Sequence, residues 1–289
     1  MDALKNAMPD GVTLCLPGAT AFDLAPEKGG PAYRIFVSVP DGDAPPSGFP
    51  VIYVLDGNAD FVTVSETVRR VTRRPAATGI HPAIVVGIGY PNTASYDAER
   101  RYFDFTLKAP AGGQDHDAGL AYGGQAAFID FLTRCLMPRI ERRFAADPTR
   151  RMLLGHSLAG YFALEVAARC PGLFSGYACF SPSIWWDREG LGQRLDEGGL
   201  MTASSRLYLA AGRYEQETAP WQAAHAASED YLAVRESRRM VDNARDLAAR
   251  LTATFADEER IRFELGEQED HATILPSLLC RALRFLQSS

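Results

Sequence analysis

The stretch Met152-Leu-Leu-Gly-His-Ser-Leu-Ala-Gly160 decides the fold of this 289-residue chain. Its apolar start is typical of a strand, and residues 158–169 have the pattern of a helix. A serine between a strand and a helix occupies a strained turn, so small residues must stand two positions before and two positions after it. Gly155 and Ala159 hold those positions around Ser157. We interpret the stretch as a nucleophile elbow, although an ordinary strand-to-helix turn is the alternative.

Apolar runs alternate with amphipathic patterns along the rest of the chain. Continuous apolar runs such as 51–55 and 83–88 are typical of strands buried on both faces of a sheet. The alternation predicts one α/β domain over residues 1–289, with a mostly parallel sheet and helices on both faces. Further strands are expected at 33–39, 151–154, 175–180, 206–211 and 261–265, and helices at 61–73, 125–144 with an interruption at Pro138, 158–169, 231–251 and 275–286.

Two segments of the sequence are expected to lie over the site rather than in the sheet. The first, residues 90–122, contains glycine, aspartate and aromatic residues and is expected to be a loop. The second is an insert around residues 183–204. Long loops inside compact domains are usually functional. We therefore expect both segments to cover the site at the elbow.

Ser157 needs a base, because a neutral hydroxyl is a weak nucleophile and histidine is its usual partner. His271 follows the last expected strand, at the carboxyl edge of the sheet where such a base stands. His156 adjoins the serine, but the turn directs its side chain elsewhere, so we interpret it as a packed, hydrogen-bonded residue. The other histidines are His81, His116 and His225.

The third group of such a site is a carboxylate that orients the histidine. The order serine, acid, histidine places it after the strand at 206–211. Glu215 is the first choice there and Glu217 the second. Asp187 and Asp230 are more distant alternatives, and a serine–histidine pair without a strong acid stays open.

Acyl transfer also requires hydrogen-bond donors for the oxyanion that forms during the reaction. The backbone N–H of Leu158, directly after the nucleophile, is one expected donor. The other is the backbone N–H of Asn58, in the loop after the strand at 51–55, where Gly57 is expected to let the backbone turn toward the serine. A plain strand-to-helix turn is the alternative for this loop.

These pieces, taken in order, resemble the esterase D / antigen 85 type of esterase within the α/β-hydrolases, and more closely its trilactone siderophore esterases. The resemblance covers the chain from about residue 33 to the C-terminus. It rests on Leu55-Asp-Gly-Asn58, Arg101-Tyr-Phe-Asp-Phe-Thr106, Gly123-Gly124, the stretch from Phe128 to Pro138, Gly155-His-Ser-Leu-Ala-Gly-Tyr-Phe-Ala-Leu164, Phe180-Ser-Pro-Ser-Ile-Trp-Trp-Asp187 and Asp270-His271. The family's serine, histidine and oxyanion positions fall on Ser157, His271, Asn58 and Leu158, and its acid falls less securely on Glu215.

The resemblance implies a serine esterase that hydrolyses carboxylic esters through an acyl-enzyme, with a catechol siderophore ester as substrate and iron arriving only inside that substrate. No cofactor is expected. Two rivals remain: another carboxylesterase, thioesterase or acyltransferase with the same machinery, and a catalytically silent ligand-binding protein of this fold.

A ferric tris-catecholate is a bulky anion with aromatic faces, so its site needs cations and flat apolar surface. Arg100, Arg101, Trp185 and Trp186 are the candidates for substrate binding. The run Asp115-His116-Asp117 has metal-ligand residue types, but no second histidine-rich segment supports a metal site.

Composition narrows the partners and the compartment. The net charge of −6 argues against nucleic-acid binding through a general basic surface. No run of about 18 apolar residues is present, so no membrane-spanning helix is expected. Five cysteines, without a CxxC motif, are not typical of a disulfide framework. We expect a cytoplasmic protein, and the oligomeric state stays open.

Overall fold

The computed structural model describes residues 15–110, 119–198, 205–222, 229–255 and 259–288, and within them eight strands form one sheet. The order across the sheet is β1-β2-β4-β3-β5-β6-β7-β8. β2 is antiparallel to β1 and β4, and the remaining pairs are parallel. The strands are β1 (Ala19–Leu24), β2 (Tyr33–Ser38), β3 (Phe49–Val54), β4 (Ile84–Gly89), β5 (Ala146–His156), β6 (Gly176–Phe180), β7 (Arg206–Gly212) and β8 (Ile261–Gly266).

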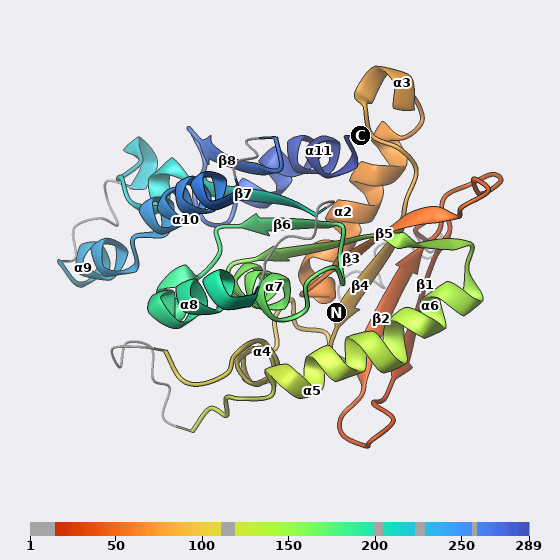
Figure 1. The fold of residues 1–289 in the computed structure, drawn as a ribbon, viewed down its shortest axis with the longest axis horizontal. Helices are drawn as coiled ribbons and strands as arrows, with labels where there is room; N and C mark the ends of the chain where they lie inside the picture. Colours follow the sequence, from red (N-terminus) through yellow and green to blue (C-terminus); the bar gives the residue numbers. More distant parts are fainter. Residues whose placement is uncertain (1–14, 111–118, 199–204, 223–228, 256–258, 289) are drawn as a thin grey trace, which may run out of the picture.

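Helices cover both faces of this sheet, so the predicted fold class is confirmed (Figure 1). The longer ones are α2 (Gly57–Val71), α7 (Leu158–Arg169), α8 (Arg188–Gly198), α9 (Glu229–Arg238), α10 (Met240–Phe255) and α11 (Ile274–Gln287). The shorter ones are α3 (Pro75–Thr78), α4 (Ala98–Phe105), α5 (Gln125–Asp130), the π-helical η1 (Phe131–Leu136), α6 (Met137–Arg143) and the 3₁₀ turns η2 (Ile184–Trp186), η3 (Arg213–Glu215) and η4 (Pro220–Gln222).

Alternation along the central strands divides the core into two clusters. In β3, Val51 and Tyr53 face the cluster that contains α7 and α10, while Ile52 and Val54 face the cluster that contains α2 and α11. The strands β3, β4 and β6 are buried at every position, as expected for strands covered on both faces. The parallel strands therefore end at one common edge, where β5 and β3 lie side by side.

The predicted single helix over residues 231–251 is wrong, because the chain breaks into α9 and α10 at Arg239. Arg239 has φ 44°, a left-handed conformation that terminates a helix. The side-chain amide of Asn243, in the first turn of α10, donates to the backbone carbonyl of Arg238 at 2.9 Å. No glycine stands at this position, and the helical periodicity continues through it, so the sequence did not indicate the break.

The segment 90–122, predicted to be a loop, contains the helix α4. Asp97 caps its first turn, since its carboxylate accepts from the backbone N–H of Arg100 at 3.0 Å. The interruption expected near Pro138 takes the form of the wide π turn η1, which ends directly before α6, and Pro138 stands in the first turn of α6.

Candidate active site

Ser157 lies in a strained turn between β5 and α7, with φ 59° and ψ −120°. A Cβ on Gly155 would meet the carbonyl oxygen of Ala159 at 2.4 Å, so only glycine fits at that position. Ala159 itself is fully buried in α7 and keeps the helix regular. The geometry is that of a nucleophile elbow, and alanine is compatible with it at the second small position.

His271 and Glu215 complete a hydrogen-bonded series with the serine. His271 Nε2 is 3.0 Å from Ser157 Oγ, and His271 Nδ1 is 2.6 Å from Glu215 Oε2. The histidine stands in the turn after β8 and the glutamate in η3 after β7, so adjacent parallel strands deliver both to the serine. The structure thus brings the three predicted residues together.

Glu215 is held in one orientation although it lies in a short turn. It is 5% exposed. Its Oε1 accepts from the backbone N–H of Gly212 at 2.7 Å and from the hydroxyl of Ser181. Its other oxygen therefore stays directed at the histidine.

The alternative acids point elsewhere. The side chain of Glu217 is 64% exposed and faces Arg213 at 3.9 Å. Asp187 pairs with Arg194 at 2.9 Å and with Lys108 at 3.4 Å. The side chain of Asp230 lies outside the described residues, as do His116, His225 and the Asp115-His116-Asp117 run.

His156 is buried and hydrogen-bonded, as predicted. Its Nε2 donates to the backbone carbonyl of His271 at 2.7 Å, and the two ring centroids are 4.6 Å apart. Burial and the neighbouring His271 lower the pKa of His156 to about 3. The ring is therefore neutral above that pH and does not oppose a positive charge on His271.

The two predicted oxyanion donors lie in the first turns of α2 and α7, where backbone N–H groups lack intrahelical acceptors. Leu158 lines the cleft beside Ser157. The side chain of Asn58 bonds the backbone of Tyr90, accepting from its N–H at 2.8 Å and donating to its carbonyl at 3.1 Å. Asn58 therefore joins the start of α2 to the end of β4.

The expected role of Gly57 requires correction. The left-handed residue of this turn is Asp56, with φ 51°. Gly57 is needed for close packing instead, because a Cβ there would approach the backbone carbon of Gly87 in β4 to 2.8 Å.

A cleft of about 490 Å³ opens at Ser157. Of the four predicted substrate-binding residues, Arg101, Trp185 and Trp186 line it. Residues from both segments predicted to cover the site thus reach it. Sequence reasoning missed the lining residues Tyr214, Arg235 and Arg238. Tyr214 stands in η3 beside Glu215, and nothing in the sequence indicates which face of α9 turns inward.

Arg100 and Arg101 lie on different sides of α4. Arg101 forms a buried ion pair with Asp56 at 2.7 Å and faces the catalytic side. Arg100 lines a separate cavity, where its guanidinium lies 4.7 Å from the ring centroid of Tyr33. Consecutive residues of a helix diverge by about 100°, so the predicted placement of Arg100 at the cleft is wrong.

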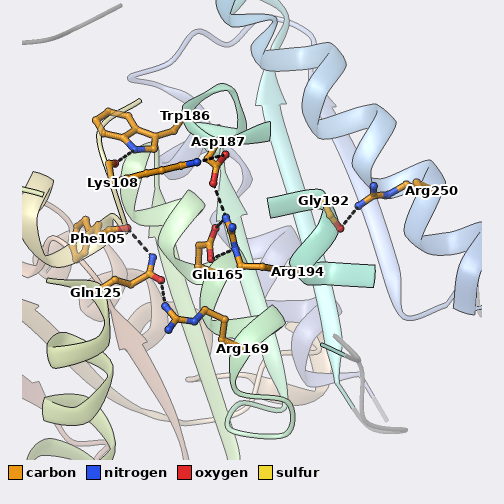
Figure 2. A network of polar contacts seen from close by, with 10 residues as sticks. All are labelled: Phe105, Lys108, Gln125, Glu165, Arg169, Trp186, Asp187, Gly192, Arg194 and Arg250. Carbon is orange, nitrogen blue, oxygen red and sulfur yellow. Dashed lines mark hydrogen bonds and ion pairs between the residues drawn. The ribbon is translucent and has the colours of Figure 1, made fainter. Parts of the chain in front are cut away.

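Trp186 belongs to a network of polar contacts (Figure 2). Its indole N–H donates to the carbonyl of Lys108 at 3.0 Å. The next residue, Asp187, pairs with Arg194 of α8, which also binds the fully buried Glu165 of α7 at 2.8 Å. The network connects the wall of the cleft to the helix that follows the nucleophile.

A serine, a histidine and a buried carboxylate in series at the carboxyl edge of a parallel sheet define a serine hydrolase of the α/β-hydrolase fold. A family model described as "Putative esterase" matches residues 29–271. The chain belongs to this esterase family, as the sequence resemblance predicted, and is a carboxylic ester hydrolase.

Characterised relatives are similar over nearly the whole chain. Ferri-bacillibactin esterase BesA of Bacillus subtilis is 36% identical over 281 residues, which cover 93% of this chain and 90% of the relative. The siderophore enterobactin esterase of Emericella nidulans is 31% identical, with 94% and 96% covered. The crystal structure of the BES protein from Bacillus cereus superposes with a TM-score of 0.81 at 30% identity, with 97% of this chain and 100% of that chain covered.

Proposed function

We propose that this esterase hydrolyses the ester bonds of a catechol-type siderophore through an acyl-enzyme formed on Ser157. The observation that carries the proposal is the hydrogen-bonded series from Ser157 Oγ through His271 to Glu215. The substrate class is supported by the siderophore esterases among the relatives and by the tryptophans that line the cleft.

Each proposed step uses one group of the site. His271 Nε2 accepts the proton of Ser157 as the hydroxyl oxygen attacks the ester carbonyl. Glu215 holds His271 in the required tautomer and stabilises its positive charge. The protonated His271 then donates its proton to the leaving alcohol, and a water molecule repeats the sequence to release the acid.

The proposed oxyanion site consists of the backbone N–H groups of Asn58 and Leu158. Both belong to helix N-termini, which favour negative charge. The strands that precede them, β3 and β5, pair in parallel, and Leu55 N–H donates to the carbonyl of Leu154 at 3.0 Å. Arg101 also lines the cleft, and its guanidinium is held there by the ion pair with Asp56.

The proposed compartment is the cytoplasm, where iron delivered as a siderophore complex would be released. All five cysteines are free thiols, which is typical of reducing compartments. Among the described residues, no helix has the length and apolar character needed to cross a membrane.

Mass spectrometry of siderophores incubated with the enzyme tests this function. We expect ring opening and stepwise shortening of a trilactone catechol siderophore, tested both iron-free and iron-loaded. Ser157→Ala and His271→Ala should each lose nearly all turnover, and the double variant should be little worse, because such residues act as a unit.

The rival functions give different results. Cleavage of simple acyl esters but of no siderophore would leave only a general esterase. Transfer of the acyl group from Ser157 to an added acceptor alcohol would indicate an acyltransferase. Failure of a fluorophosphonate probe to label native Ser157 would indicate a silent ligand-binding protein.

A further inference from the structure

An exposed tryptophan stands at the rim of the catalytic cleft. Trp221, in η4, is 62% exposed, the largest value among the exposed large apolar side chains of the described residues. The next residue, Gln222, lines the cleft, and so does Val234 of α9, which is itself 42% exposed. An apolar surface therefore continues from the cleft to the outside.

This rim is fixed to the loop that carries His271. The rings of Trp221 and Tyr214 meet edge to face, with centroids 5.1 Å apart. Tyr214 also lines the cleft, and its backbone N–H donates to the carbonyl of Glu269 at 3.0 Å. The indole is thus held next to the site although most of its surface faces water.

Two arginines of α9 place positive charge along the same path. Arg235 donates to the side chain of Gln222 at 3.3 Å. Arg238 lies 4.6 Å above the ring of Trp185. Both line the cleft. Cationic and aromatic groups together form a surface that favours anionic aryl groups.

The cleft volume of about 490 Å³ is in the range for one drug-sized group. A substrate with several aryl arms exceeds that volume, so arms other than the one at Ser157 must lie at the rim. An arm placed there would stack on the exposed indole and pair with the arginines.

We propose that Tyr214, Trp221, Arg235 and Arg238 form an outer subsite, which binds an anionic aryl arm of the substrate while an ester bond of the same molecule lies at Ser157. The inference rests on the proposed function and adds to it a site for the arms that are not being cleaved. It predicts that recognition depends on two arms rather than one.

A pair of substrates isolates this subsite. The ester-linked dimer of 2,3-dihydroxybenzoylserine carries an arm on each side of its ester, and the methyl ester of the monomer carries one arm. We expect Trp221→Ala to lower the preference for the dimer, measured as the ratio of the two kcat/KM values, on the order of tenfold. Trp221→Phe should restore most of the preference, and Val62→Ala, which shortens an exposed apolar side chain of α2, should keep the wild-type ratio.

Binding to the Ser157→Ala variant separates the subsite from the chemistry. Calorimetry should give a lower Kd for the dimer than for the methyl ester, and the added Trp221→Ala change should remove this difference. If the dimer is hydrolysed and the ratio of the two kcat/KM values is unchanged by Trp221→Ala, the subsite is overturned and the proposed function stands. Tight, Trp221-dependent binding of a dimer that the wild type never cleaves would overturn the function and keep the subsite. A dimer that binds no better than the methyl ester would overturn the subsite.

Discussion

Glu215 orients His271 through one carboxylate oxygen while Gly212 and Ser181 occupy the other. Glu215→Gln would keep the shape of the side chain but place a neutral amide beside the imidazole. We expect kcat to fall by about 10²- to 10⁴-fold, less than in Ser157→Ala, because the nucleophile remains. Glu217→Gln is the matched control, since that side chain is exposed. Steady-state kinetics measures kcat for both variants. A low kcat in Glu217→Gln together with a normal kcat in Glu215→Gln would show that Glu217 is the catalytic acid.

His156 makes the folded state sensitive to acid. Its pKa is about 3 in the folded protein and near 6.5 in an unfolded chain, so between these values the unfolded state binds more protons. The stabilising contribution of the neutral ring is complete above pH 6.5 and is lost progressively as the pH falls toward 3.

The slope of stability against pH measures this contribution. We expect the free energy of unfolding of the wild type to fall by up to about 1.4 kcal/mol per pH unit more steeply than that of His156→Gln over this window. Urea unfolding at several pH values gives both slopes, and the difference cancels the contributions of other carboxylates and histidines. Parallel slopes would mean that His156 keeps an ordinary pKa in the folded protein.

At the scale of elements, the ion pair between α7 and α8 holds the wall of the cleft (Figure 2). Arg194→Leu would leave Glu165, which is fully buried, without its cation. Breaking a buried pair from one side costs about 3–5 kcal/mol. Arg245→Leu, at an exposed pair with Asp242, should cost about 0.5 kcal/mol or less. Chemical denaturation of both variants tests this, and equal losses would mean that the network carries no special stability.

The elements that sequence could predict are those whose signals are local. Residues 158–169 form the predicted helix because an apolar periodic stretch ends before Pro171-Gly172, and the apolar runs form central strands. The break at Arg239 could not be predicted, since it depends on a left-handed arginine supported by Asn243 across the turn. The helix α4 was missed because it is short and its buried face includes the charged Asp104.

The site divides in the same way. The order of strands was enough to place Ser157, Glu215 and His271 at one edge, because parallel strands bring their carboxyl ends together. Which arginines line the cleft could not be predicted from the order of the strands along the chain. Treating 90–122 as a loop assigned Arg100 and Arg101 to one surface, and only the helical geometry of α4 separates them.

At the scale of the whole molecule, a net charge of −6 opposes an anionic substrate, whereas Arg235 and Arg238 attract it at the cleft. The Debye length is about 10 Å at 0.1 M salt, so distant charges are largely screened there and the cations next to the bound substrate dominate. We expect kcat/KM for the anionic catechol dimer to fall several-fold as NaCl rises from about 0.05 to 0.5 M, while that for neutral p-nitrophenyl acetate stays constant within about twofold.

Stopped-flow or steady-state assays at fixed pH provide the two salt profiles, and KCl in place of NaCl controls for specific ion effects. The sign of the slope decides which charges matter. If kcat/KM for the dimer rises with salt, screening has removed a repulsion, and the net charge controls encounter. If it falls, screening has removed an attraction by cations such as the cleft arginines Arg235 and Arg238, in spite of the negative net charge. The Arg238→Gln variant should then show a shallower fall than the wild type, because one of the attracting charges is gone.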